Sequence, residues 1–218
     1  MKYDGKQVVI TGATRGLGRM LADYFQSEGA NVVGLSRSEG CDVSKPEDVR
    51  RCMPRKLDIL INNAGVAGSG LAMTLSPESA RDTISTNLLG PLYASQEAAR
   101  AMRATGGRII NIGSVHTALE PIGASAYVAS KAGLEGLTGV LAKEFAPYGI
   151  TVNTLGLSPM DTDMLASLTE GQRAAFIARL PLPRLATFDD VRVAIDFFCS
   201  PEASFYTGQT LYLGGIHG

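Results

Sequence analysis

The chain has 218 residues, of which 45% are hydrophobic, and its formal net charge at pH 7 is -1. This composition is typical of a globular protein, and we expect residues 1–218 to form a single domain. The absence of a basic excess argues against nucleic-acid binding, and no run approaches the ~20 apolar residues of a membrane span.

Short aliphatic or β-branched runs alternate with longer helical patterns along the chain. The runs are continuous in hydrophobicity, as expected for strands that helices cover on both faces of a sheet. The predicted strands are Gln7–Ile10, Asn31–Leu35, Ile59–Ile61, Arg108–Ile112, Thr151–Leu155 and Thr210–Leu213. The predicted helices are Leu17–Glu28, Pro46–Met53, Pro77–Thr105, Ala126–Ala146 and Asp189–Cys199. This alternation predicts an α/β fold, a Rossmann-type doubly wound parallel sheet that binds ligands at the carboxyl ends of its strands.

A glycine-rich turn joins the first predicted strand to the first predicted helix. It reads Thr11-Gly12-Ala13-Thr14-Arg15-Gly16-Leu17-Gly18. Glycines allow close backbone approach, and the helix N-terminus offers unpaired N–H groups to a diphosphate. The spacing differs from the G-x-G-x-x-G fingerprint, and the turn could serve only as a turn. Its place at the start of an alternating chain favours nucleotide binding.

The end of the second predicted strand bears on the choice of cofactor. It reads Leu35-Ser36-Arg37, with no carboxylate for a ribose 2′-hydroxyl, and Arg15 lies in the glycine-rich turn. Two guanidinium groups can bind a 2′-phosphate. We therefore predict NADP(H) over NAD(H), the alternative being two solvated surface arginines.

Tyr127 and Lys131 lie four residues apart in the run SAYVASK. On a helix this spacing places both side chains on one face. An ammonium group beside a phenol favours the phenolate, so we expect Lys131 to lower the pKa of Tyr127 from its reference value of about 10. Tyr127 would then serve as a proton donor and acceptor near neutral pH.

Taken in order and at their separations, the motifs resemble the short-chain dehydrogenase/reductase family. They are TGATRGLG, Asn62-Asn63-Ala64-Gly65, Asn87, Ser114 and Tyr127-x-x-x-Lys131. The likeness covers essentially the whole chain, as far as Thr207-Gly208-Gln209 and Leu213-Gly214-Gly215. It is strongest to the short, single-domain members typified by bacterial 3-oxoacyl-acyl-carrier-protein reductases.

The resemblance implies roles for four catalytic residues. Tyr127 would be the general acid or base, and Lys131 would lower its pKa and bind the nicotinamide ribose. Ser114 would bind the substrate oxygen, and Asn87 would hold a water that links Lys131 to solvent. The implied cofactor contacts are Gly12, Thr14, Arg15, Gly16, Leu17, Gly18, Arg37, Asp42, Val43, Asn63, Ala64, Gly65, Tyr127, Lys131, Met160 and Thr162.

The chain departs from these relatives in three places. The interval from Arg37 to Asp42 is very short, so the helix between the second and third strands is largely missing. The third strand is then reduced to Gly40–Val43, which leaves the adenine side of the site more open. Relatives usually have Pro-Gly where this chain has Leu157-Ser158, and often Asp-Gly-Gly where it has Leu213-Gly214-Gly215.

Several residues have a second interpretation. Asp42 could only cap the helix that begins near Pro46, although Ser44 is better placed for that. His116 lies two residues beyond Ser114 and could bind a polar or anionic substrate, but a histidine facing water is the favoured interpretation. The segment from Met160 to Pro183 is expected to form a mobile flap over the substrate.

Three cysteines, Cys41, Cys52 and Cys199, form no CxxC pair, and the chain has two histidines, so a zinc site is not expected. An odd number of separated cysteines fits buried, reduced thiols in a cytoplasm. The N-terminal run MKYDGKQVVITGA lacks a signal-peptide pattern.

The leading hypothesis is an NADP(H)-dependent oxidoreductase that interconverts a small-molecule carbonyl and a secondary alcohol. The alternatives are an NAD(H)-linked sugar, steroid or alcohol dehydrogenase and, from another class, a dinucleotide-sensing protein without turnover. The presence of all four catalytic residues argues against the sensor. The small residues of Pro77–Thr105 and Ala126–Ala146, which pair across the subunit contact in relatives, predict a homodimer or homotetramer.

Overall fold

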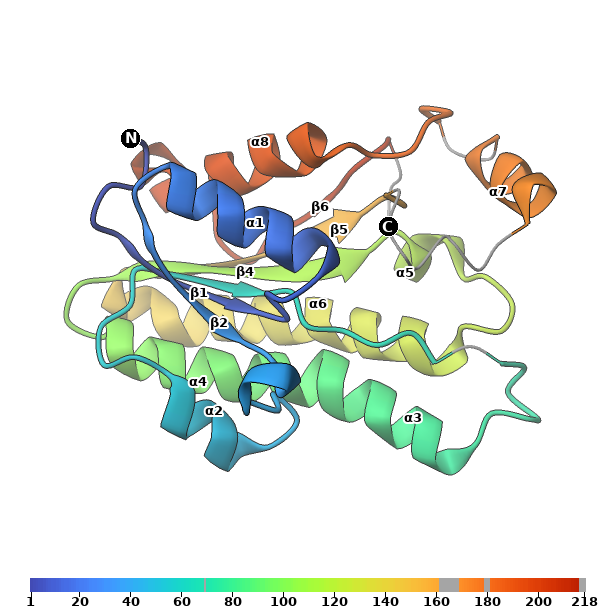
Figure 1. Ribbon diagram of the computed structural model, residues 1–218, viewed down its shortest axis with the longest axis horizontal. Coiled ribbons are helices and arrows are strands. Elements are labelled where there is room, and N and C mark those ends of the chain that lie inside the picture. Colours follow the sequence, from blue (N-terminus) through green and yellow to red (C-terminus); the bar gives the residue numbers. More distant parts are fainter. Residues whose placement is uncertain (69, 161–168, 179–180, 216–218) are drawn as a thin grey trace.

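The computed structural model describes residues 1–68, 70–160, 169–178 and 181–215. Its centre is a sheet of six parallel strands in the order β2-β1-β3-β4-β5-β6. The strands are β1 (Gln7–Thr11), β2 (Asn31–Leu35), β3 (Ile59–Asn62), β4 (Gly107–Ser114), β5 (Ile150–Leu157) and β6 (Thr210–Tyr212). The predicted α/β fold with a doubly wound parallel sheet is confirmed (Figure 1).

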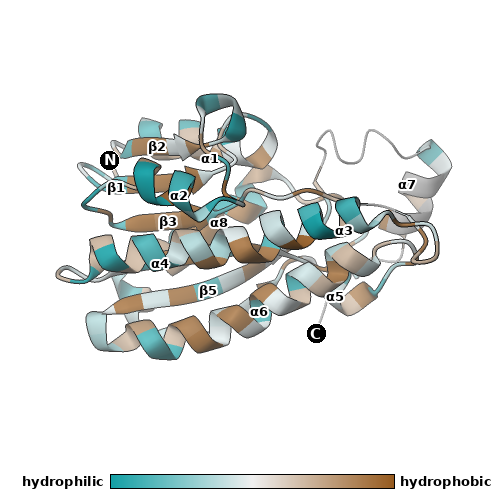
Figure 2. Ribbon diagram, turned by 90° about the horizontal axis from the view of Figure 1, so that it is seen from below, coloured by the Kyte–Doolittle hydropathy of each residue, from teal (hydrophilic) through white to brown (hydrophobic). Residues whose placement is uncertain are grey.

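Helices cover both faces of this sheet (Figure 1). One face carries α1 (Gly16–Ser27) and α8 (Phe188–Cys199). The other carries α2 (Pro46–Cys52), α4 (Gly90–Met102) and α6 (Ser125–Phe145). Figure 2 views this second layer, in which α3 (Pro77–Ile84) and α4 run end to end alongside α6. Two short helices, α5 (His116–Leu119) and α7 (Glu170–Ile177), complete the set in the described residues.

Successive residues of each strand supply the two faces of the core. In β1, Val8 and Ile10 pack with Leu21 and Phe25 of α1, whereas Val9 packs into the opposite cluster. Because such strands are buried on both faces, their sequences are unbroken apolar runs, which is the pattern from which they were predicted. Both β4 and β5 extend two residues beyond the predicted ends, which places Ser114 in the sheet.

The predicted helix Pro77–Thr105 is interrupted by a π-helical segment, Ser85–Leu89, and ends at Met102. Within the segment, the N–H of Gly90 donates to the carbonyl oxygen of Ser85, five residues earlier. Pro91 follows and has no N–H to continue the regular helical ladder. Such bulges are frequent at functional sites, and this one contains Asn87.

The prediction of a third strand at Gly40–Val43 is wrong, although the expected loss of a helix is confirmed. A single 3-10 turn, Arg37–Glu39, replaces the helix. Gly40 follows with φ 80°, and the N–H of Cys41 donates to the carbonyl oxygen of Ser36 at 3.0 Å. The chain therefore folds back over the end of β2 instead of running beside it, and β2 forms the edge of the sheet.

The described part of the chain contains no helix long and apolar enough to cross a membrane. The same residues contain no cluster of three or more His, Cys, Asp or Glu side chains that could hold a metal ion. Cys41, Cys52 and Cys199 are free thiols.

Candidate active site

The glycine-rich turn brings the backbone of β1 against the start of α1. Gly12 and Gly16 have φ values of 68° and 53°, in the left-handed region that favours glycine. A Cβ on Gly18 would lie 2.2 Å from the carbonyl oxygen of Gly12 and 2.5 Å from Asn63 Nδ2. Only glycine fits at position 18, and the close contact fixes the path of the turn.

Asn63 clamps this turn to the end of β3. Its Nδ2 donates to the carbonyl oxygens of Thr11 and Gly12, at 3.0 and 3.3 Å. The backbone N–H groups of Asn63 and Ala64 each donate to Thr11 Oγ1 at 2.9 Å. The Asn63 side chain therefore shapes the predicted cofactor site from behind the turn.

The N-terminus of α1 is suited to an anion. Its N-cap residue, Arg15, has extended backbone and makes no side-chain capping bond, and the first turn has no acidic residue. Uncapped N–H groups and the positive end of the helix dipole favour a diphosphate. The turn and Arg15 thus fit the diphosphate of a dinucleotide.

A cavity of about 330 Å³ lies next to Arg37, on the expected open adenine side. Its other walls are residues 66–68 and polar residues of α3 and the π segment, which include Asp82 and Thr86. The expectation that no carboxylate lies at this end of β2 is wrong, because Glu39 lies there. Glu39 Oε2 lies 3.2 Å from the position of a Cβ on Gly34, and Ala13 Cβ lies 3.0 Å from that position. The sequence did not predict this position of Glu39, because it depends on the 3-10 turn that folds the chain back over β2.

Asp42 binds the backbone of its own loop. Its Oδ1 accepts from the N–H and hydroxyl of Ser44, at 3.0 and 2.8 Å. Burial alone would raise the pKa of Asp42, but these bonds and the nearby Arg37 lower it. Helix α2 has Lys45 as its N-cap and no side-chain capping bond, so neither Asp42 nor Ser44 caps it. Val43 is buried in the core against Gly90.

Lys131 is fully enclosed between α6 and the sheet. Its Nζ donates to the carbonyl oxygen of Ile112 at 2.7 Å and lies 5.9 Å from the centre of the Tyr127 ring. Gly65 lies beside it, since a Cβ there would be 3.8 Å from Nζ and 3.5 Å from Asn87 Oδ1. Burial lowers the pKa of Lys131 to about 8.

The prediction that Lys131 lowers the pKa of Tyr127 is wrong for this structure. Burial raises the pKa of Tyr127, and a hydrogen bond with Ser114 offsets only part of that rise. The ammonium group is directed to Ile112 and the face of the ring, so burial of the phenol dominates. Tyr127 is therefore held as a neutral phenol in contact with Ser114, which suits a proton donor.

Asn87 joins three parts of the site. Its Oδ1 accepts from the N–H of Val66, and its Nδ2 donates to the carbonyl oxygen of Val66, both at 2.9 Å. Nδ2 also lies 3.1 Å from Ser130 Oγ on α6. Asn87 thereby fixes the loop after β3 against the helix that carries Tyr127 and Lys131.

His116 is half-buried rather than fully exposed to water as the favoured interpretation of the sequence expected. Its ring packs edge-on against Tyr127, with 5.8 Å between centroids, and its backbone N–H donates to Ser114 Oγ at 3.2 Å. Burial lowers its pKa. The imidazole thus lies beside the phenol as part of the candidate site.

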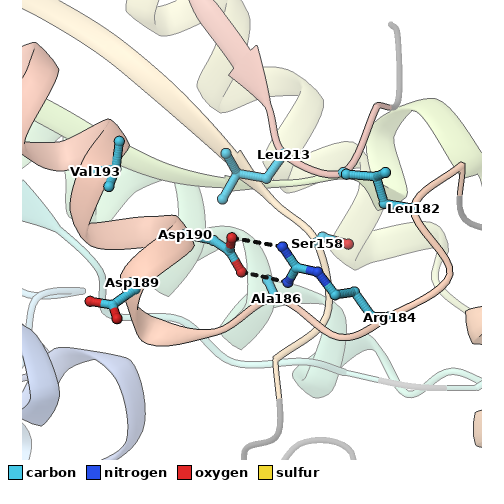
Figure 3. Close-up of a pocket in the computed structure, with 9 residues that line it drawn as sticks. Ser158, Leu182, Arg184, Ala186, Asp189, Asp190, Val193 and Leu213 are labelled. Carbon is cyan, nitrogen blue, oxygen red and sulfur yellow. Dashed lines mark hydrogen bonds and ion pairs between the residues drawn. The ribbon is translucent and has the colours of Figure 1, made fainter.

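The loop after β5 borders a second cavity, also of about 330 Å³ (Figure 3). Met160 is buried and pairs with Ala186. Arg184 makes two hydrogen bonds to Asp190 at 2.7 and 2.9 Å, which tie the segment before α8 to that helix (Figure 3). The cavity is lined by Ser158, Leu182, Arg184, Ala186, Asp189, Asp190, Val193, Leu213 and Gly214, and by none of the four catalytic candidates. Thr162 lies outside the described residues.

A family profile described as Enoyl-(Acyl carrier protein) reductase matches residues 12–217. The chain is 35% identical to the 3-oxoacyl-(acyl-carrier-protein) reductase FabG of Vibrio harveyi, over 99% of this chain and 98% of the relative. It is also 35% identical to that of Escherichia coli K12, with the same coverage. The chain belongs to the short-chain dehydrogenase/reductase family.

Solved structures agree with this assignment. A structure assigned to a gluconate dehydrogenase of Agrobacterium tumefaciens superimposes with a TM-score of 0.90 at 28% identity, covering 98% of this chain and 96% of that one. One assigned to a short-chain alcohol dehydrogenase of Sinorhizobium meliloti 1021 gives 0.90 at 29% identity, covering 97% and 96%. The protein is an NAD(P)-dependent oxidoreductase acting on CH–OH or C=O groups.

Replacement of Gly18 tests the close contact in the turn. We expect Gly18→Ala to destabilise the protein by about 2 kcal/mol or more and to weaken dinucleotide binding, because its Cβ would overlap Gly12. Gly171→Ala is the control, since nothing lies within 4 Å of a Cβ there. Urea unfolding and dinucleotide titration measure both effects, and equal stability of the two variants would contradict the expectation.

The lowered pKa of Lys131 predicts a pH-dependent stability. Between pH 8 and 10 the unfolded chain retains a proton on this lysine that the folded protein has lost, so stability should rise with pH. The free energy of unfolding of the wild type, relative to Lys131→Met, should increase by about 2 kcal/mol across this range. Urea unfolding at both pH values measures it. A difference that stays constant or shrinks would show that the ammonium group is not desolvated.

Proposed function

We propose that residues 1–218 form one NAD(P)-binding domain in which Tyr127 is the general acid that protonates a carbonyl oxygen, or the base in the reverse direction. The observation that carries this proposal is the proximity of the Tyr127 phenol to Ser114, beside a buried Lys131. A bound nicotinamide dinucleotide supplies or accepts the hydride. The chain contributes position and proton transfer.

Ser114 and Tyr127 can share one substrate oxygen. Both hydroxyls lie at the carboxyl edge of the sheet, and two donors there would stabilise charge that develops on that oxygen. Lys131 would hold the nicotinamide ribose and, with its pKa near 8, pass a proton toward Tyr127. Asn87 would hold the loop after β3 against α6. It would also hold the water that links Lys131 to solvent.

NADP(H) is the favoured cofactor. Arg15 and Arg37 are both exposed, and two guanidinium groups suit a 2′-phosphate. Asn63, Ala64 and Gly65 would border the adenosine and ribose, while Asp42 and Val43 would lie near the adenine. Met160 and Thr162 would lie near the carboxamide of the nicotinamide.

One observation favours a second candidate, an NAD(H)-linked sugar or alcohol dehydrogenase. The carboxylate of Glu39 lies over the end of β2, where an acidic group accepts hydrogen bonds from a ribose 2′-hydroxyl. Initial rates with NADPH and NADH, measured on a carbonyl panel that includes a 3-oxoacyl thioester, separate the two candidates. The names of the curated relatives make that thioester the first substrate to test.

We also propose a cytoplasmic homodimer or homotetramer. The free thiols suit a reducing compartment. On α6, Gly136 and Gly139 have open space around them and Val140 is 53% exposed, so a second copy could approach this helix closely. Sedimentation that shows only monomer at micromolar concentration would contradict this assembly.

Replacement of the phenol tests the acid directly. Tyr127→Phe should lower kcat by about 10²- to 10⁴-fold, because it removes the proton donor, and leave dinucleotide affinity within about threefold. Tyr148→Phe, which alters an exposed phenol, should retain full activity. Steady-state kinetics and dinucleotide titration measure both variants. Near-normal turnover by Tyr127→Phe would remove Tyr127 from this role.

Three substitutions test the choice of cofactor. Arg15→Ala and Arg37→Ala should each raise the KM for NADPH by about tenfold or more and change that for NADH little, because each removes a charged partner of the phosphate. Glu39→Gln should lower the KM for NADPH, since it removes a negative charge. If both arginine variants use NADPH as well as the wild type does, the assignment of the phosphate site is wrong.

A further inference from the structure

A hydrogen-bonded cluster of three side chains lies behind Ser114. Thr117 Oγ1, on α5, lies 2.8 Å from the carbonyl oxygen of Ser114 and 2.9 Å from Glu135 Oε1 on α6. The hydroxyl of Tyr212, on β6, lies 2.8 Å from Thr117 Oγ1 and 2.8 Å from Glu135 Oε1. Two consecutive helices, α5 and α6, therefore meet the last strand, β6, at the turn that follows β4.

The donors and acceptors of this cluster can be assigned. Burial raises the pKa of Tyr212, so its hydroxyl keeps its proton at neutral pH and donates. Glu135 Oε1 accepts from Tyr212, which leaves the Thr117 hydroxyl to donate to the carbonyl oxygen of Ser114 or to Glu135. Each hydroxyl proton has an acceptor, so the three side chains hold one another in place.

Packing fixes Tyr212 in this position. A Cβ on Gly156 would lie 2.2 Å from Tyr212 Cδ1, so the ring crosses β5 where only glycine leaves room. Tyr212 also packs against Val115, a fully buried residue that directly follows Ser114. The last strand of the sheet thereby supports the turn that carries Ser114.

Glu135 connects this support to the candidate acid. Tyr127, Lys131 and Glu135 are spaced four residues apart on α6 and share one face of the helix. Tyr127, in the first turn of α6, lies near the Ser114 hydroxyl. Glu135, two turns later, bonds to Thr117, which in turn contacts the Ser114 carbonyl oxygen. One rigid helix thus restrains Ser114 relative to Tyr127 at two points.

We propose that Thr117, Glu135 and Tyr212 are positioning residues, which hold the Ser114 turn in the place that lets Ser114 and Tyr127 bind one substrate oxygen. This inference rests on the proposed function, because it assigns these residues to the same reaction. None of the three is required to touch substrate. They act through Ser114, and small displacements of a catalytic group are enough to slow a reaction strongly.

Two substitutions of Thr117 separate positioning from packing. Thr117→Val keeps the shape and removes the hydroxyl, whereas Thr117→Ser keeps the hydroxyl. We expect Thr117→Val to lower kcat by about tenfold with the KM for dinucleotide within twofold, and Thr117→Ser to stay within about threefold of the wild type. Tyr212→Phe should match Thr117→Val, and the double variant should be little slower than either, because the residues act as one unit.

Amide hydrogen exchange of the protein alone gives a readout that needs no turnover. Thr117→Val should speed exchange in the 115–120 backbone by about tenfold and leave β1 unchanged, because the cluster restrains that turn. Turnover within twofold of the wild type in Thr117→Val overturns the inference, and so does a Thr117→Ser variant as slow as Thr117→Val. If the wild-type protein reduces no carbonyl, that result counts against the proposed function. In that case the hydrogen-exchange rates decide the positioning role alone, and unchanged amide exchange in Thr117→Val overturns it.

Discussion

The hydrogen bond from Lys131 Nζ to the carbonyl oxygen of Ile112 determines how α6 lies against the sheet. An ammonium group removed from water needs a partner inside the protein, because an unpaired buried charge is costly. That requirement holds α6 close to β4 along its first turns. Tyr127, one turn earlier, then reaches Ser114 at the end of β4. The same bond therefore fixes two of the proposed catalytic groups.

Small residues create the room that this arrangement needs. A Cβ on Gly113 would lie 2.7 Å from Thr154 Cγ2, so β4 and β5 approach closely just before Ser114. Gly65 places no side chain against the buried Lys131 ammonium and Asn87 amide, since a Cβ there would lie 3.8 Å from Nζ and 3.5 Å from Oδ1. Asn87 holds this loop against α6 through three hydrogen bonds of its side-chain amide. The site is thus closely packed around the lysine.

The sequence was sufficient for features that depend on local pattern. Apolar runs identified all six strands, and the glycine spacing located the turn that Gly18 makes possible. Features that depend on tertiary contact were not predictable in this way. Residue spacing showed that Lys131 and Tyr127 share a helix face, but only the folded environment shows that burial raises the pKa of Tyr127. The position of Glu39 could not be predicted for the same reason, because it depends on the path that the chain takes after β2.

The shortened segment after β2 changes the charge of the adenosine end as well as its shape. The chain returns to α2 through one 3-10 turn, and Arg51 Nη2 holds this path by donating to the carbonyl oxygen of Gly40 at 2.7 Å. This turn brings the Glu39 carboxylate beside Gly34 of β2, and so adds a negative charge at the strand end to which the proposed phosphate site is assigned. Glu39 is exposed, so its side chain can turn into solvent at little cost when a 2′-phosphate approaches. In the proposed site, the two arginines would therefore outweigh Glu39 in favour of NADP(H), and the carboxylate would give a weaker site for a 2′-hydroxyl.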